Sequence, residues 1–184
     1  ADYRALMAYL RDHQYATNLD GWTETWDNLG DDGICHTCVS RTAYQNLWIA
    51  WANPVDLIAH MADEPALMEE VFAAFNDGLE KEMQCAAELA SQRPVPYILF
   101  PDNITAPMIG ETYFRKFCMP MYARQRELLD AAGCDIPIGV HADGDLKPLW
   151  DAFGESAVTW LDSMSPTPDN DTSVADALRV WPDT

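Results

Sequence analysis

The stretch "IPIGVHADGD", residues 136–145, begins as an apolar run and ends in a histidine, two aspartates and a glycine. An apolar run without alternation is typical of a strand that is buried on both faces of a parallel sheet. His141 and Asp143 follow this run two residues apart, a spacing that points both side chains to the same side of an extended segment. The pattern therefore predicts a strand whose end carries either a catalytic or metal-binding histidine, or a histidine that only caps a turn.

Segments of similar character lie before and after this strand. We expect further short strands at residues 33–39, 95–103 and 157–164. Helical spacing of apolar residues and the positions of turn residues predict helices at residues 3–10, 53–65, 64–90, about 110–132, 147–155 and 172–181. The order α-β-α-α-β-α-β-α-β-α argues for a parallel sheet with crossover helices, either doubly wound or in a (β/α) barrel.

Single residues mark several helix ends. Asn53, which is followed by a proline, is suited to cap the start of a helix. Gly133 is suited to end the helix before it, and Pro120 predicts that this helix is kinked or divided in two. Thr172 or Ser173 is expected to cap the last helix.

Functional side chains of parallel α/β folds gather at the carboxyl ends of the strands, because the loops there vary on a rigid base. The predicted strands deliver the following groups to these ends: Cys35, His36, Cys38, Asp102, Asn103, His141, Asp143, Asp145 and Asp162. We expect His141, Asp143 and Asp102 to be catalytic. His141 and Asp143 can also bind a metal through nitrogen and oxygen. The expected substrate-binding residues are Asn103, Asp145 and Asp162, although Asp102 and Asn103 also suit an ordinary Asx turn.

The motif "CHTC" at residues 35–38 has the spacing of a zinc-binding pair. No second CxxC or CxxH follows it, so the motif gives little support to a structural zinc site. A redox role is also disfavoured, because thioredoxin-like motifs occur in a different arrangement of strand and helix. Buried free cysteines are therefore the favoured interpretation.

The composition argues against some classes of partner. Thirty acidic and 11 basic residues give a net charge of −19, which repels nucleic-acid phosphates and anionic lipids. No apolar run approaches the ~18 residues that cross a membrane, and no targeting signal is recognisable. Five cysteines, an odd number without a regular framework, fit reduced thiols. We expect a cytoplasmic protein with a small-molecule substrate and neither a nucleic-acid nor a membrane partner.

Several motifs occur together in the second half of the chain. They are a strand ending in an acidic residue ("YILFPD"), a helix with a phenylalanine and then a proline ("YFRKFCMPMY"), a strand ending in His-x-x-Gly ("VHADG") and a strand carrying an acidic residue ("TWLD"). As a set, over roughly residues 60–184, they resemble the middle of the uroporphyrinogen decarboxylase superfamily.

The resemblance implies a (β/α)8 barrel that is roughly twice as long as this chain. The chain would then be a partial TIM barrel of about four consecutive β/α units with parallel strands. We expect residues 1–184 to form a single domain of this type that is incomplete at both ends. Such a domain leaves sheet edges unpaired, so self-association is also expected.

The superfamily includes two chemistries. Decarboxylases bind a substrate with many carboxylates in an arginine-lined cup. Cobalamin-dependent methyltransferases carry a zinc site that begins with His-x-Cys at the strand matching "VHADGD". Asp143 stands in the place of that cysteine, so the resemblance implies zinc held by the nitrogen of His141 and an oxygen of Asp143, with a third ligand beyond Thr184.

Charge favours the second chemistry. The sequence contains eight arginines, and acids rather than arginines follow the predicted strands, which disfavours decarboxylation of a porphyrinogen. We therefore expect a methyltransferase-like enzyme in which a metal assists methyl transfer and a partner protein carries a corrinoid. The alternatives are a uroporphyrinogen decarboxylase whose arginines lie outside this chain, and a non-catalytic fragment or binding domain.

Overall fold

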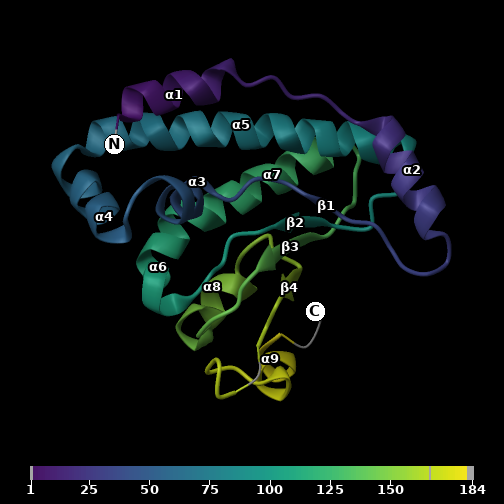
Figure 1. Cartoon of the computed structure of the whole chain (residues 1–184). Coiled ribbons are helices and arrows are strands. Elements are labelled where there is room, and N and C mark those ends of the chain that lie inside the picture. The colour runs from purple at the N-terminus through teal and green to yellow at the C-terminus, as the bar shows by residue number, and fades with distance from the viewer. Residues whose placement is uncertain (1, 166, 182–184) are drawn as a thin grey trace.

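The computed structural model describes residues 2–165 and 167–181, which form four short strands and a set of helices (Figure 1). The strands are β1 (Thr37–Cys38), β2 (Ile98–Phe100), β3 (Ile138–His141) and β4 (Trp160–Asp162). All three pairings are parallel, and the spatial order is β1-β2-β3-β4. The predicted parallel sheet is confirmed. In the part of the chain that the structure describes, the strand order does not reverse as it does in a doubly wound sheet.

Helices precede, connect and follow the strands. Before β1 lie α1 (Tyr3–Asp12) and α2 (Leu19–Leu29). Between β1 and β2 lie α3 (Ala43–Asn46), the π-helical turn η1 (Leu47–Trp51), α4 (Pro54–Asp63) and α5 (Pro65–Gln92). Between β2 and β3 lie α6 (Ala106–Tyr113), the π-helical turn η2 (Phe114–Cys118) and α7 (Met119–Ala131). The 3-10 turn η3 (Lys147–Leu149) and α8 (Trp150–Gly154) precede β4, and α9 (Val174–Val180) follows it. Within the described residues no helix is both long and apolar enough to cross a membrane.

Most predicted helix ends follow from local signals. The side chain of Asn53 accepts a hydrogen bond from the backbone N–H of Val55 at 2.9 Å and begins α4. Of the two candidate caps for α9, the residue that serves is Ser173, whose hydroxyl oxygen accepts from the backbone N–H of Asp176 at 3.1 Å. Gly133 follows α7 with a φ of 69°, which a residue with a side chain rarely adopts.

The predicted interruption near Pro120 is also present. The helical stretch begins at Ala106, earlier than the expected residue 110, and Gly110 breaks its regularity with a φ of 62°. The π-helical turn η2 comes next, and Pro120 occupies a starting position of α7. A proline fits there because its missing N–H has no partner in the first helical turn.

The pattern of apolar residues did not predict α2. This helix has no buried residue, so it lacks a buried apolar face. Its indole N–H groups instead hold it to the rest of the chain, since Trp22 and Trp26 each donate to the carbonyl oxygen of Pro94 at 3.2 Å. The short α3 with η1 was likewise not predicted.

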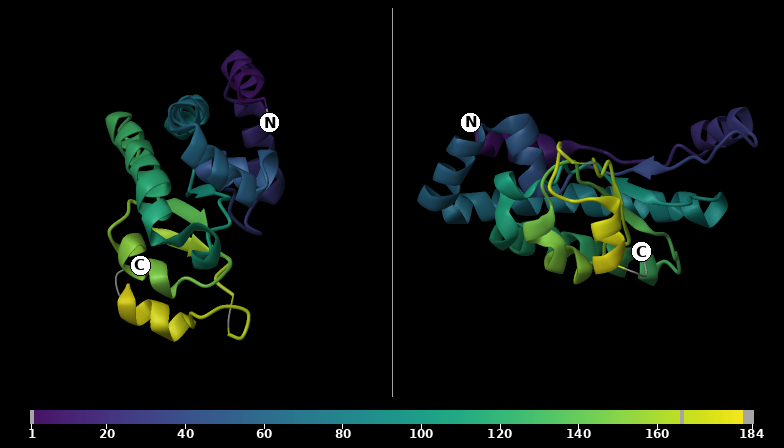
Figure 2. Two further views of the ribbon diagram at one scale, coloured as in Figure 1. Left: turned by 90° about the vertical axis from the view of Figure 1, so that its left-hand side faces the viewer. Right: turned by 90° about the horizontal axis from the view of Figure 1, so that it is seen from below.

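One face of the sheet forms the core. Ile98, Phe100, Ile138 and Val140 point to this face and are fully buried. Helices α5 and α7 run along it (Figure 1, Figure 2), and the ring of Phe100 lies 5.2 Å from the ring of Tyr122 on α7. Burial of these four side chains against the helices supplies the main apolar contact that fixes the sheet.

The opposite face is the open face. Strand register and the alternation of side chains along each strand show which residues belong to this face. They are His36, Cys38, Tyr97, Leu99, Gly139, His141, Trp160 and Asp162. Apart from Gly139, these residues are partly or largely exposed. A ligand therefore has access to the side chains of this face.

β1 and β4 are the outer strands of the described sheet. Burial raises the pKa of the Cys38 thiol on β1, and the charge of the Asp162 carboxylate on β4 adds to this effect.

Candidate functional site

His141 ends β3 and lies between two carboxylates. Its Nδ1 is 2.8 Å from Oδ2 of Asp162, and its Nε2 is 3.6 Å from Oδ2 of Asp143. The first contact follows from the strand alignment, which pairs His141 with Asp162. The side chains of His141, Asp162 and Asp143 are 26%, 38% and 43% exposed, so a ligand can reach all three. Three of the expected site residues thus meet at the carboxyl end of the open face.

Asp162 determines which ring nitrogen of His141 carries the proton. Partial burial raises the pKa of Asp162, but hydrogen bonds from His141 and Ser163 outweigh this effect and bring the pKa below its ordinary value. The carboxylate is therefore ionised at neutral pH and favours a proton on Nδ1 of His141. Nε2 is then the nitrogen that can accept a proton or bind a metal, on the side where Asp143 lies.

Asp102 lies apart from this group, in the protein interior. It is fully buried and accepts hydrogen bonds from the backbone N–H of Thr42 at 2.7 Å, the Thr42 hydroxyl at 3.2 Å and the Tyr122 hydroxyl at 2.5 Å. Its own N–H donates to the carbonyl oxygen of Phe100 at 2.9 Å, a tight turn that takes the chain out of β2. These contacts direct Asp102 toward α3 and α7 and do not bring it to His141.

Burial dominates the chemistry of this interior group. It raises the pKa of Asp102 from 3.8 to about 6, although the hydrogen bonds from Tyr122 and Thr42 and the charge of Arg41 oppose it. Burial likewise raises the pKa of Tyr122 and of Cys118, and the nearby Asp102 carboxylate adds to both effects. Asp102 is therefore suited to hold the loop after β1 in place through its hydrogen bonds with Thr42.

Asn103 and Asp145 lie on two adjoining loops beside the site. The loops are joined by backbone hydrogen bonds from Ile104 to the carbonyl oxygen of His141 (3.0 Å) and from Ala106 to that of Asp145 (2.8 Å). Asn103 has a φ of 56°, a conformation that asparagine tolerates better than most residues. Among the described residues, the side chains of Asn103 and Asp145 have no hydrogen-bond or ion-pair partner, so both are available to a ligand.

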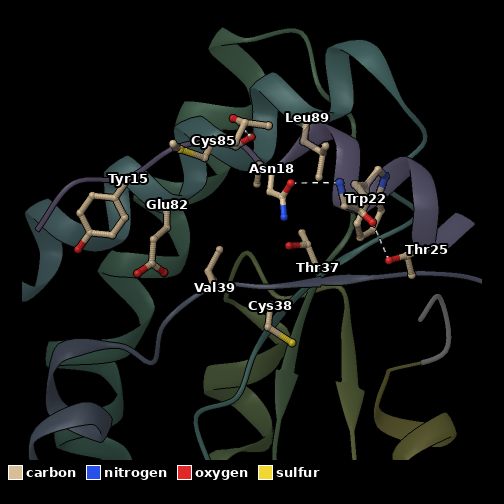
Figure 3. A pocket seen from close by; sticks show the side chains of 14 residues that line it. Tyr15, Asn18, Trp22, Thr25, Thr37, Cys38, Val39, Glu82, Cys85 and Leu89 are labelled. Carbon is tan, nitrogen blue, oxygen red and sulfur yellow. Dashed lines mark hydrogen bonds between the residues drawn. The ribbon is translucent and has the colours of Figure 1, made fainter.

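The cysteines of "CHTC" differ in their surroundings. Cys35 is buried and Cys38 is exposed, and both are free thiols. The expectation of buried cysteines is therefore correct for Cys35 and wrong for Cys38. Because the two lie three residues apart in an extended segment, they point to opposite faces. Figure 3 shows Thr37 and Val39 directed toward the helices, with the sulfur of Cys38 on the other side.

Sequence reasoning missed several groups that support the site. Thr42 belongs to no motif, and Tyr122 ends the motif "YFRKFCMPMY" without having been expected to contact Asp102. Their contacts with Asp102 span 60 and 20 residues. The carboxylate of Asp171 accepts hydrogen bonds from the backbone N–H groups of Leu146 (2.8 Å) and Lys147 (3.2 Å), which fixes the loop after His141. The position of Asp171 in the polar loop after β4 was the available signal. Pro166 of the same loop is outside the described residues.

The donor atoms fit part of a zinc site. Nε2 of His141 and the carboxylate of Asp143 are chemically suited to zinc, and Asp162 is placed as the carboxylate that orients the histidine. In residues 2–165 and 167–181, no group of three or more His, Cys, Asp or Glu side chains is arranged to hold a metal ion. The described chain therefore offers two donors and not a full ligand set.

A cavity of about 550 Å³ lies on the helix side of β1, between α2 and α5 (Figure 3). Tyr15, Asn18, Trp22 and Glu82 are among its lining residues. Glu82 is engaged, because it accepts hydrogen bonds from the N–H and hydroxyl of Ser40 at 2.5 and 2.7 Å. The cavity is on the helix-covered face and is separate from the carboxylates around His141.

Comparison with known proteins finds no family model, no curated protein and no solved structure that matches this chain.

Proposed function

We propose that the chain is part of a (β/α)8 barrel enzyme of the uroporphyrinogen decarboxylase superfamily, and that it contributes the metal-binding side of a methyl-transfer site. The parallel pairing of four strands in unreversed order supports a barrel. The resemblance of "YFRKFCMPMY" and "VHADGD" supports the superfamily. The five free thiols support a reducing compartment, and we propose that the enzyme acts in the cytoplasm on a small molecule.

The observation that carries the proposal is the position of His141 between Asp162 and Asp143. A carboxylate that holds one ring nitrogen of a histidine orients the other nitrogen toward a metal. His141 and Asp143 would hold zinc, while Asp162 keeps the imidazole in the required tautomer. When bound, zinc supplies Lewis-acid chemistry that lowers the pKa of a nucleophile. A corrinoid carried by a partner protein is part of this proposal.

The remaining residues have supporting roles. Asn103 and Asp145 bind polar groups of the substrate, since their side chains have no partner among the described residues. Asp102 acts as a positioning residue because its carboxylate is enclosed by Thr42 and Tyr122. Its role is to fix the loop that follows β1.

The arginines favour methyl transfer over decarboxylation of a substrate with many carboxylates. A cup for such a substrate needs several guanidinium groups at the carboxyl ends of the strands. The following arginines instead pair with acidic side chains of helices: Arg115, Arg124, Arg126 and Arg179. Arg41 follows β1, and a single guanidinium group there does not make a cup.

Metal binding tests the proposal directly. The purified protein is titrated with Co²⁺, whose visible absorption reports its ligands, and with Zn²⁺ in competition. We expect binding that His141→Ala abolishes and that His13→Ala, a change on the distant α1 cap, leaves intact. Methyl transfer from methylcobalamin to a thiol acceptor should follow the same pattern. Equal metal binding by both variants contradicts the proposal.

A further inference from the structure

Three aromatic rings lie on the open face below the carboxylates of the site. The ring of His36 stacks on that of Tyr97 at 4.8 Å, and the ring of Tyr97 meets that of Trp160 edge to face at 4.6 Å. His36 and Tyr97 stand just before β1 and β2, and Trp160 begins β4. These three residues, the aromatic platform, therefore extend across the width of the sheet.

Gly139 on β3 makes room for the platform. A Cβ atom at this position would lie 2.1 Å from Cε2 of Trp160, so the indole rests directly against the backbone of β3. Trp160 thereby reaches over β3 to contact Tyr97 beside β2. The strand conformation at Gly139 suits any residue, so it is the indole that requires glycine here.

Two carboxylates lie beyond the aromatic platform, toward the carboxyl ends of the strands. Asp162 follows Trp160 by two residues on the same face, a separation of about 6.6 Å along a strand. Asp143 lies on the other side of His141. No lysine or arginine among the described residues pairs with Asp143 or Asp162, and the net charge of the chain is −19. A cation beside the platform therefore lies near carboxylates that no described lysine or arginine neutralises.

We propose that this surface binds a methylated ammonium group, which rests on Trp160 and faces the carboxylates of Asp162 and Asp143. The inference rests on the proposed function, because it names the class of substrate for the methyl transfer. Binding of the cation itself requires neither the metal nor the corrinoid.

The chemistry of the surface selects among ligands. An aromatic face attracts a cation, and tryptophan does so most strongly. A quaternary methylated ammonium group, such as that of choline, has no N–H group and spreads its charge over apolar methyl groups. It needs no hydrogen-bond acceptor, so it loses little hydration energy on contact with rings. A primary ammonium group is strongly hydrated and needs acceptors for three N–H groups. An anion is repelled by the carboxylates.

Choline and 3,3-dimethylbutan-1-ol provide the decisive comparison, because they have the same shape and differ in charge. Each is titrated into the metal-free protein by calorimetry at about 0.15 M salt, which screens distant charges. We expect choline to bind at least about 10-fold more tightly than the neutral alcohol, which corresponds to a cation–π and carboxylate gain of about 1.4 kcal/mol or more. Equal binding of the two, or no binding of choline, overturns the proposal.

Variants locate the binding surface. Trp160→Leu should lower choline affinity by about 10-fold, Trp160→Phe by less, and Asp162→Asn by several-fold. Trp51→Leu is the matched control, since Trp51 is 45% exposed and lies on η1. Circular dichroism verifies that each variant is folded. Choline binding that is unchanged in folded Trp160→Leu places the ligand elsewhere and overturns the proposal.

The result is separable from the metal test. Selective choline binding without Co²⁺ binding supports the ammonium site and contradicts the proposed metal-assisted function. Co²⁺ binding at His141 without selectivity for choline over its neutral analogue keeps the proposed function and rejects the methylated ammonium substrate.

Discussion

The hydroxyl group of Tyr122 lies 2.5 Å from Oδ2 of Asp102, and this contact joins α7 to the end of β2 inside the protein. Asp102 also receives two hydrogen bonds from Thr42, at the start of α3. One buried carboxylate thus connects three segments of the chain. Its energetics lead to the first two predictions.

The pH dependence of stability should report the burial of Asp102. Burial, opposed by the hydrogen bonds, raises its pKa from 3.8 to about 6 in the folded protein. As the pH rises from about 4 to about 6, the unfolded chain releases this proton while the folded protein retains it. The contribution of Asp102 to the free energy of unfolding therefore falls by about 3 kcal/mol over this range and is constant above it.

Asp102→Asn is the reference for this measurement, because the amide does not titrate and the other carboxylates are common to both proteins. Urea unfolding at several pH values should show that the difference in unfolding free energy between the wild type and the variant changes most between about pH 4 and 6. A difference that is constant over this range contradicts the raised pKa.

Tyr122→Phe removes one hydrogen bond to the buried carboxylate. We expect a loss of about 1.5–3 kcal/mol in unfolding free energy at neutral pH, where Asp102 is ionised, and a smaller loss at acidic pH. The pKa of Asp102 should rise further, because the Tyr122 hydrogen bond is the largest effect that lowers it. Tyr9→Phe, at a residue that is 54% exposed, should change stability little. Similar losses in the two variants would argue against the network.

Gly139→Ala tests the contact between β3 and Trp160. The added Cβ would lie 2.1 Å from the indole, so Trp160 must move. We expect a loss of about 1–3 kcal/mol in unfolding free energy and a change in tryptophan fluorescence. Gly33→Ala is the control, because its Cβ would meet its nearest neighbour, a Leu29 methyl carbon, at an ordinary 3.5 Å. An unchanged spectrum in Gly139→Ala would show that the indole does not lie there.

Asp143→Asn should weaken the retention of a bound metal by about 10 to 100-fold, since it removes the charge of a ligand or of a neighbouring carboxylate. The fold should be unaffected, because the side chain is 43% exposed in a loop. Competition between the protein and a chelator measures the effect. Asp169→Asn, in the loop after β4, serves as a control for loss of charge. Equal retention by both variants would exclude Asp143 from the metal site.

Self-association follows from the edges of the sheet. Within the described residues, β1 and β4 each pair on one side only. Unpaired edges attract another strand, whereas the net charge of −19 opposes contact between copies. Light scattering should therefore detect dimers or larger species at tens of micromolar, in an amount that increases with salt as repulsion is screened. A clean monomer at both low and high salt would contradict the prediction.

The sequence by itself determined the elements that depend on neighbouring residues. The period of apolar residues predicted a helix over 64–90, which the structure has as α5 at Pro65–Gln92. The cap at Asn53, a cap of the last helix at Thr172 or Ser173, and an interruption of the helix near Pro120 were also predicted. Apolar runs located all four described strands, and their alternation with helices predicted parallel pairing. Each of these signals depends on residues that are close together in the sequence, so it can be recognised without knowledge of the tertiary structure.

Only the tertiary structure decided which polar groups meet. His141 and Asp162 are 21 residues apart in sequence, and strand register brings them to 2.8 Å. Asp102 comes just after a strand much as Asp162 ends one, but a tight turn sends Asp102 into the interior to Thr42 and Tyr122. A carboxylate at a strand end has the same sequence signature in both cases. Its burial, its partners and its pKa depend on contacts between distant segments, which form when the core packs and not before.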